Sequence, residues 1–317
     1  MAYAVAVADE GGFSAAARRL DVAQPSVSQA VAQLERELGA RLFDRIGRRV
    51  VVTAAGEALL APARRMLREA RAAQDAVAAV GGLAAGHLDL VALPTVATDP
   101  VAGLIGSFRG AYPGIQVRVA EPDTADEAWS VVAAGLAELA FAEAPKAGHD
   151  LLAQALFAQE LVVVAPPGHP LETAGVRPAE LARWPLIAPP PGTSTRRLLD
   201  GVLAAVGHRA TIAVETAQRE SIVPLVLAGA GVALLPEATA RRAAASGAVV
   251  ARLRPALVRT LGIVHRRGAL SPAAQAFVDL AAASLGSARE RGSDRPGRAP
   301  RLGPAQGTRT SPGEDDR

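Results

Sequence analysis

The stretch FSAAARRLDVAQPSVSQAVAQLEREL, residues 13–38, contains two helical patterns separated by a turn at Asp21 and Val22. The first pattern has its apolar residues on one side of a short helix: Phe13, Ala16, Ala17 and Leu20. The second begins at Pro25, which suits the first turn of a helix, and its apolar residues fall within a narrow arc: Val27, Val31, Leu34 and Leu38. The opposite arc carries Pro25, Ser28, Gln29 and Arg36. Because Gln and Ser near a helix start can hydrogen-bond to base edges or phosphates, this composition favours a DNA-reading helix over one that is merely solvated.

Residues 41–53, RLFDRIGRRVVVT, form two short β-prone runs around Gly47 and carry four arginines against one aspartate. A basic hairpin of this kind can lie against DNA phosphates, which positions a protein on the duplex without specifying sequence. Residues 54–82 then predict one long helix that Thr53 caps, in which Pro62 predicts a kink. Its apolar residues recur at spacings of three, four or seven: Leu59, Ala63, Leu67, Ala70, Val77 and Val80.

From His87 onward, short apolar runs alternate with helical stretches, which predicts βαβ units and a largely parallel sheet. The predicted strands are His87–Leu93, Ile115–Glu121, Glu138–Ala142, Glu160–Ala165, Leu186–Ala188, Thr211–Glu215, Val232–Leu235 and Leu261–His265. Residues 287–317 have almost nothing to bury, so we expect a disordered tail. That tail is either a solvated end or a segment that touches DNA through its arginines.

The composition narrows the function classes. The chain has 317 residues, half of them apolar, a formal net charge of +3 and no cysteine, which excludes disulfides, a thiol nucleophile and Cys-ligated zinc. The five histidines lack metal-ligand or catalytic-triad spacing, and Gly229-Ala230-Gly231 lacks the third glycine of a dinucleotide-binding loop. We therefore expect no enzyme, metal or cofactor. Residues 1–8 lack the features of a signal peptide, and the longest apolar run, 222–236, is too short for a membrane span, so we expect a cytoplasmic protein.

Five blocks at matching spacing resemble the N-terminal signature of LysR-type transcriptional regulators. They are FSAAARRL at 13–20, QPSVS at 24–28, LE-x-ELG at 34–39, LF-x-R at 42–45 and T-x-AG at 53–56. The resemblance implies an α/β protein with an all-α winged helix-turn-helix, a linker helix and a two-lobed α/β effector domain of the type II periplasmic-binding-protein fold. It further implies that Gln24, Pro25, Ser28 and Gln29 face the bases and that Ser14, Arg45, Arg48 and Arg49 contact the DNA backbone.

The resemblance also implies that the linker helix pairs with a second copy through Leu59, Ala63, Leu67, Ala70 and Val77, giving a homodimer that can assemble into a tetramer. The alternative is a helix folded back onto its own domain. Ala23 stands where the family often has Ser or Thr, so a phosphate or capping hydrogen bond is lost there. The chain also opens at Met1 where family members have further residues in the first helix; either the true start lies upstream or DNA binding is impaired.

The remaining chain resembles the family's effector domain in the order of its segments, which include YPGI at 112–115, VAPPGHPL at 164–171 and GAGVALLP at 229–236. The resemblance divides the protein into a DNA-binding domain at 1–53, a linker helix at 54–82, an effector domain at 87–286 and a tail at 287–317. Lobe I comprises about 87–164 and 265–286 and lobe II about 165–264. The chain should cross between lobes near 164–166 and near 263–265, with the ligand in the cleft between them.

Such a cleft gathers strand ends and helix N-termini, which attract anions. Thr95 and Thr98 follow the first strand, and Thr193 and Ser194 lie in the segment 191–195 that opens another helix. These hydroxyls are candidates to hold a carboxylate, and the alternative is simple helix capping. Weaker candidates at strand ends are Glu143 and Thr216.

These observations predict a DNA-binding transcriptional regulator controlled by a small-molecule effector. Its partners are double-stranded DNA, the effector, further copies of itself and, if it is an activator, RNA polymerase. The alternative is a solute-binding module of the type II fold that carries a vestigial or truncated DNA-binding region and does not recognise DNA.

Overall fold

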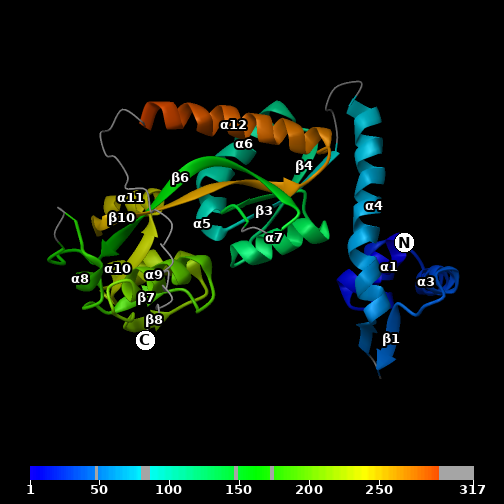
Figure 1. Ribbon diagram of the computed structural model, residues 1–317, viewed down its shortest axis with the longest axis horizontal. Coiled ribbons are helices and arrows are strands. Elements are labelled where there is room, and N and C mark those ends of the chain that lie inside the picture. The colour runs from blue at the N-terminus through cyan, green and yellow to red at the C-terminus, as the bar shows by residue number, and fades with distance from the viewer. Residues whose placement is uncertain (47–48, 80–85, 146–148, 172–174, 293–317) are drawn as a thin grey trace, which may run out of the picture.

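The computed structural model describes residues 1–46, 49–79, 86–145, 149–171 and 175–292, arranged as in Figure 1. The N-terminal domain consists of α1 (Ala2–Glu10), α2 (Phe13–Arg19), α3 (Gln24–Leu38) and the hairpin strands β1 (Phe43–Ile46) and β2 (Arg49–Val52). The apolar faces predicted for α2 and α3 meet α1 in one core, in which Ala6, Ala16 and Val27 are fully buried. Leu38 does not join this core, because it ends α3 and is 46% exposed.

Helix α4 (Ala54–Ala79) starts where the sequence predicts and continues through Pro62. The Thr53 hydroxyl accepts a hydrogen bond from the backbone N–H of Gly56 at 3.1 Å and donates one to the Arg41 carbonyl at 2.6 Å. Thr53 therefore caps α4 and ties it to the wing. Gly56 has no room for a side chain, since a Cβ there would lie 2.3 Å from the Leu42 carbonyl oxygen.

The C-terminal domain is built on an eight-stranded sheet in the order β4-β3-β5-β10-β6-β9-β7-β8. The strands are β3 (Gly86–Ala92), β4 (Ile115–Ala120), β5 (Leu139–Ala142), β6 (Leu151–Ala165), β7 (Leu186–Ala188), β8 (Ile212–Glu215), β9 (Val232–Pro236) and β10 (Val249–Arg266). The outer pairings are parallel, as predicted. The central pairings made by β6 and β10 are antiparallel. A largely parallel sheet is therefore wrong at the centre, where two long strands pair directly without helical crossovers.

Strands β6 and β10 begin well before their predicted starts. The missed halves, such as LLAQALFAQ in β6, mix polar and apolar residues and give no continuous apolar run. Both strands pass from one lobe to the other: Leu156 and Leu261 lie in the core of lobe I, whereas Leu161 and Leu253 lie in a core of lobe II. The crossing therefore comes earlier in each strand than the sequence predicted, between residues 156 and 161 and between 253 and 261.

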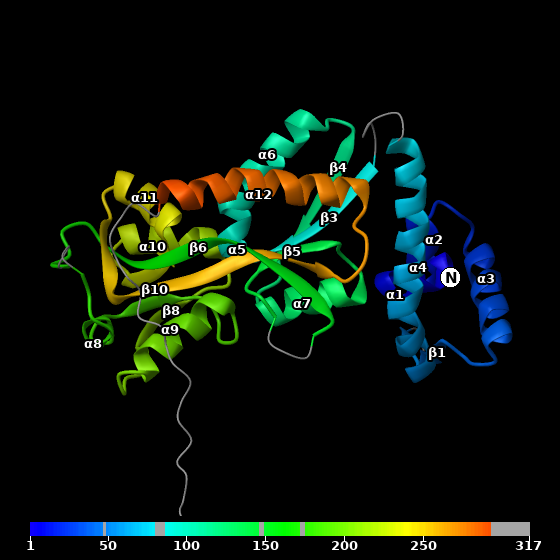
Figure 2. The same ribbon diagram turned by 45° about the horizontal axis from the view of Figure 1, so that its top comes forward.

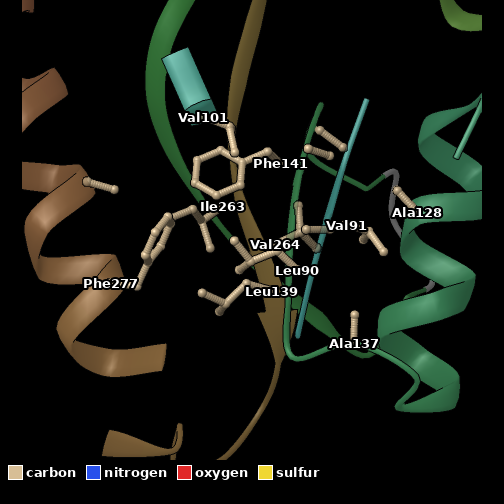
Figure 3. Close-up of a cluster of buried hydrophobic side chains, with 14 of the residues drawn as sticks. Leu90, Val91, Val101, Ala128, Ala137, Leu139, Phe141, Ile263, Val264 and Phe277 are labelled. Atoms are coloured by element: carbon tan, nitrogen blue, oxygen red, sulfur yellow. The ribbon is translucent and has the colours of Figure 1, made fainter. Parts of the chain in front are cut away.

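Helices cover both faces of the sheet. Lobe I carries α5 (Pro94–Val96), η1 (Ala97–Val101), α6 (Ala102–Ala111), α7 (Ala125–Ala134) and α12 (Pro272–Gly292). Lobe II carries α8 (Pro178–Leu181), α9 (Ser194–Ala204), η2 (Arg219–Ser221), α10 (Ile222–Leu227) and α11 (Glu237–Ala245). Figure 3 shows Phe277 on α12 and Ala128 on α7 on opposite sides of the strands that carry Leu90 and Val264. Burying a phenylalanine such as Phe277 contributes roughly 1.5–3 kcal/mol, so lobe I has a firm core.

Two features of the predicted tail can be compared with the structure. Residues 287–292, assigned to that tail, continue helix α12 instead. The rest of the predicted tail, 293–317, lies outside the described residues. Among the residues described, no helix combines the length and apolar character needed to cross a lipid bilayer.

Candidate functional site

The start of α3 presents a polar surface on the outside of the N-terminal domain. Gln24, Pro25 and Gln29 are exposed and Ser28 is half-buried, while Val27 on the opposite face is fully buried. The Gln24 amide donates to the Ser28 hydroxyl at 2.7 Å, so the structure brings these two predicted base-facing residues together. Ala23 is the N-cap residue and provides no side-chain hydrogen bond, as its identity implied.

The wing is held against α3 by a carboxylate. Glu35 accepts the backbone N–H of Leu42 at 2.7 Å and that of Phe43 at 3.3 Å, which explains why an acidic residue lies in an otherwise DNA-facing helix. Ser14 and Arg49 are both exposed. The side chain of Arg45 and the whole of Arg48, also predicted to contact the DNA backbone, lie outside the described part of the chain.

The linker helix divides its apolar residues between two faces. Ala63 is 1% exposed and packs with Val5 and Leu60 against α1 of the same chain, and Leu59 and Leu67 lie partly buried beside it. Assigning Ala63 to a dimer contact is therefore wrong, because its surface is already used within the chain. An exposed apolar stripe remains at helical spacing: Met66, Ala70, Ala73 and Val77.

A cavity of about 580 Å³ lies between the two lobes. Lobe I contributes Pro94, Thr95 and Thr98, and lobe II contributes the apolar wall of Ile187, Ile222, Val223, Leu234 and Leu235 together with Thr195 and Arg219. Two of the predicted effector residues, Thr95 and Thr98, thus line the cleft. The cleft combines hydroxyl groups on one side with an apolar wall on the other, a surface suited to an amphipathic small molecule.

The buried base of this cleft contains an arginine that the sequence analysis missed. Arg259 on β10 has a side chain only 4% exposed and donates to Glu143 at 2.8 Å, to Gln159 at 2.6 and 3.0 Å and to the Thr95 hydroxyl. Gln159 in turn donates to the Thr95 carbonyl at 2.9 Å. Burial lowers the pKa of Arg259, and the carboxylate of Glu143 opposes that shift. The network joins the lobe-crossing strands to lobe I, and its signal in the sequence was an arginine inside the apolar run around Leu257–Val264.

The other predicted effector residues have different surroundings. Thr193 is the N-cap of α9 and accepts from the Arg196 N–H at 3.4 Å, so here the capping alternative applies. Thr216 forms a tight turn by accepting from the Gln218 N–H at 3.1 Å. The Ser194 hydroxyl is buried, without a hydrogen-bond partner among the described residues. Glu143 binds Arg259 through one oxygen, while its other oxygen is also buried and unpartnered within the described chain.

Direct bonds cross the mouth of the cleft. The backbone N–H of Ser194 in lobe II donates to the Asp123 carbonyl in lobe I at 3.1 Å. Arg219 pairs with the Asp123 carboxylate at 2.7 Å, and Arg197 pairs with Asp126 at 2.8 Å. The two lobes are therefore held in contact in the absence of any ligand between them. No group of three or more His, Asp or Glu side chains within the described ranges could hold a metal ion.

The comparisons with known proteins agree with this architecture. Residues 1–57 match the family described as bacterial regulatory helix-turn-helix protein, lysR family, and residues 81–286 match the LysR substrate binding domain. The chain belongs to the LysR family of bacterial transcriptional regulators. This LysR-type regulator therefore combines a DNA-binding helix-turn-helix with an effector-binding domain.

Relatives of this regulator match it over most of its length. It is 32% identical over 291 residues to an SDS degradation transcriptional activation protein of a Pseudomonas species, covering 87% of this chain and 92% of that protein. A full-length OxyR variant from Pseudomonas aeruginosa has a TM-score of 0.70 at 25% identity, with 89% and 92% of the two chains covered. Full-length CbnR in complex with its target DNA has a TM-score of 0.61 at 24% identity, covering 89% and 97%, and shares the fold.

Proposed function

We propose that this LysR-type regulator binds a dyad-symmetric DNA site as a homodimer, with one α3 in the major groove of each half-site. The observation that carries the proposal is the polar start of α3, where Gln24, Pro25 and Gln29 are exposed beside the wing. A glutamine amide can bond both edge positions of adenine, and Ser28 can bond either a base or a phosphate. Ser14, Arg45, Arg48 and Arg49 would contact phosphates and set the register.

The exposed stripe on α4 supports the homodimer. Met66 is 57% and Val77 is 75% exposed, and both lie on one line of the helix with Ala70 and Ala73. Pairing two such stripes would remove this apolar surface from water. Dimers would pair further into tetramers, and effector binding would change the DNA bend or a contact with RNA polymerase. The proposal places the protein in the cytoplasm with the chromosome and assigns it no catalytic step.

Footprinting and mobility shift of the full-length protein on the DNA upstream of its gene test the DNA interface. We expect a dyad-symmetric footprint whose affinity falls steeply as salt rises. Gln29→Ala should lose about 1–3 kcal/mol of base discrimination at one position per half-site. Gln33→Ala is the matched control, since Gln33 is exposed later in α3 and bonds Glu37 at 2.8 Å. An unchanged footprint and affinity for Gln29→Ala would remove Gln29 from the base contacts.

We propose further that the effector is a small organic acid bound in the interlobe cleft. Its carboxylate would accept from the Thr95 and Thr98 hydroxyls, near the charge of Arg259, and its apolar part would cover Ile187, Ile222 and Leu234. Calorimetry with organic acids and their neutral amides tests this. Thr95→Val should weaken acid binding about tenfold, equivalent to about 1.4 kcal/mol, whereas Thr260→Val on the exposed side of β10 should not. Tight binding of the acid without any DNA shift would favour the solute-binding alternative.

A further inference from the structure

A second cavity, of about 350 Å³, lies between the linker helix and lobe I. Helix α4 contributes Arg68, Glu69 and Gln74, and the C-terminal domain contributes ten further residues or fewer around His87, Arg118 and Arg266. None of its lining residues belongs to the interlobe cleft. In Figures 1 and 2, α4 lies beside the end of lobe I that is far from lobe II, so the two cavities are at opposite ends of that lobe.

The cavity has arginines in excess of the carboxylates that reach them. Arg118 pairs with Asp89 at 3.8 Å, and Arg267 pairs with Asp150 at 2.9 Å. Within the described part of the chain, no carboxylate lies within ion-pair distance of Arg68 or Arg266. Glu138 is close to both, but its two oxygens accept from the N–H and the hydroxyl of Ser271, at 2.6 and 2.8 Å.

Arg68 and Arg266 instead converge on the C-terminal end of α7. Arg68 donates to the Gly135 carbonyl, and Arg266 donates to the carbonyls of Val132 and Ala137. These carbonyls carry only the partial negative charge of a helix terminus. The Nε and Nη2 groups of Arg68 are buried with no hydrogen-bond partner among the described residues. Desolvation and then the like charge of Arg266 lower the pKa of Arg68 to about 10.

We propose that this cavity is a second ligand site, which binds a phosphoryl group through Arg68 and Arg266. A phosphate oxygen set accepts the planar fork of a guanidinium and would supply the full negative charge that both arginines lack. The cavity is larger than a phosphate ion, so both inorganic phosphate and the phosphoryl group of a small organic phosphate fit the chemistry. No carbon skeleton is specified by the lining residues.

A ligand here would couple the DNA-binding domain to the effector domain. Arg68 belongs to α4, which is fixed to α1 through the buried Ala63 and through the Arg64–Asp9 ion pair at 2.5 Å. Arg266 ends β10, the strand that also carries Arg259 at the base of the effector cleft. Only an arrangement with α4 against lobe I brings Arg68 and Arg266 together, so the ligand stabilises that arrangement over any other.

Calorimetry and thermal unfolding of the full-length protein test the site, with inorganic phosphate and glycerol 3-phosphate as separate probes and glycerol as the blank. We expect the unfolding midpoint to rise as either phosphate is increased to about 10 mM, because a ligand that binds only the folded state stabilises it. Arg68→Gln and Arg266→Gln should each weaken phosphate binding about tenfold or more, since each removes one charged partner of the anion. Tighter binding of glycerol 3-phosphate than of phosphate would identify an organic phosphate as the better occupant.

Arg241→Gln is the control for net charge, because Arg241 is exposed on α11 and lies outside both cavities. A purely structural role of the two arginines would lower the midpoint without phosphate but leave the phosphate-dependent rise intact. If Arg68→Gln does not fold, Arg68→Lys keeps the charge without the fork and should retain weaker binding. The proposal is overturned if neither phosphate binds, or if both binding constants are unchanged in the Arg68 and Arg266 variants.

Discussion

Arg259 and Arg266 lie on the same strand, β10, yet their surroundings differ. Arg259 is buried at the lobe crossing and has a carboxylate, a glutamine and a threonine as partners. Arg266 is near the linker helix and has only backbone carbonyls, with Arg68 beside it. The first site has its counter-ion built into the chain, whereas the second does not. The comparison suggests that the base of the cleft is a fixed structural element and the junction with α4 an adjustable one.

The largest effect is expected from removing the counter-ion of Arg259. Glu143→Ala leaves a buried guanidinium with neutral partners only, which should cost about 3 kcal/mol of unfolding free energy. Denaturant unfolding of the full-length protein measures the loss. Replacing both partners, with Glu143→Leu and Arg259→Met together, should recover much of it because no uncompensated charge stays buried. A loss below about 1 kcal/mol for Glu143→Ala would show that Arg259 does not depend on its counter-ion.

A smaller effect is expected at the other end of the strand. Arg266→Met should cost about 1 kcal/mol without phosphate, because lost hydrogen bonds to two carbonyls are partly offset by relief of the repulsion from Arg68. The same denaturant measurement applies. A cost as large as that of Glu143→Ala would mean that the carbonyls alone satisfy this arginine, and the contrast between the two sites would disappear.

The sequence showed the N-terminal site more fully than the cleft. A DNA-reading helix exposes its functional residues at fixed helical spacing, so Gln24, Ser28 and Gln29 could be identified from periodicity and family blocks together. The cleft is assembled from residues far apart in the chain: Thr95, Glu143, Gln159 and Arg259 come from α5, the end of β5, β6 and β10. Strand ends predicted Thr95 and Glu143, but not that a single arginine joins them.

The linker helix shows a second limit of sequence reasoning. Its apolar pattern predicted one sticky face, but periodicity cannot tell a face that packs on α1 from a face left for a partner. Ala63 and Met66 lie three positions apart, and only the structure separates the buried one from the exposed one. The unpaired charges of Arg68 and Arg266 were equally hidden, because they depend on which carboxylates the fold brings within reach.

The bonds across the cleft mouth should contribute less than either buried site. Arg219 and Asp123 pair at 2.7 Å, but the aspartate side chain is 62% exposed, so water and salt screen the attraction. A double-mutant cycle with Asp123→Ala and Arg219→Ala should give a coupling energy of about 0.5 kcal/mol. Small-angle scattering on the same variants should show a wider interlobe cleft. A coupling energy above about 2 kcal/mol would make this pair a principal support of the closed lobes rather than a weak latch.

The smallest effect is expected at a pair with solvent on all sides. The side-chain hydrogen bond from Arg177 lowers the pKa of Glu180 at the start of α8. Because the folded pKa lies below the unfolded one, the pair stabilises the fold above the ordinary Glu range and this contribution is lost as pH falls through the folded value. Glu180→Gln should therefore leave the unfolding midpoint nearly unchanged at neutral pH and remove a slight decrease on acidification. Added salt should abolish even that difference, whereas the deficit of Glu143→Ala should persist in salt, since buried charges are screened much less.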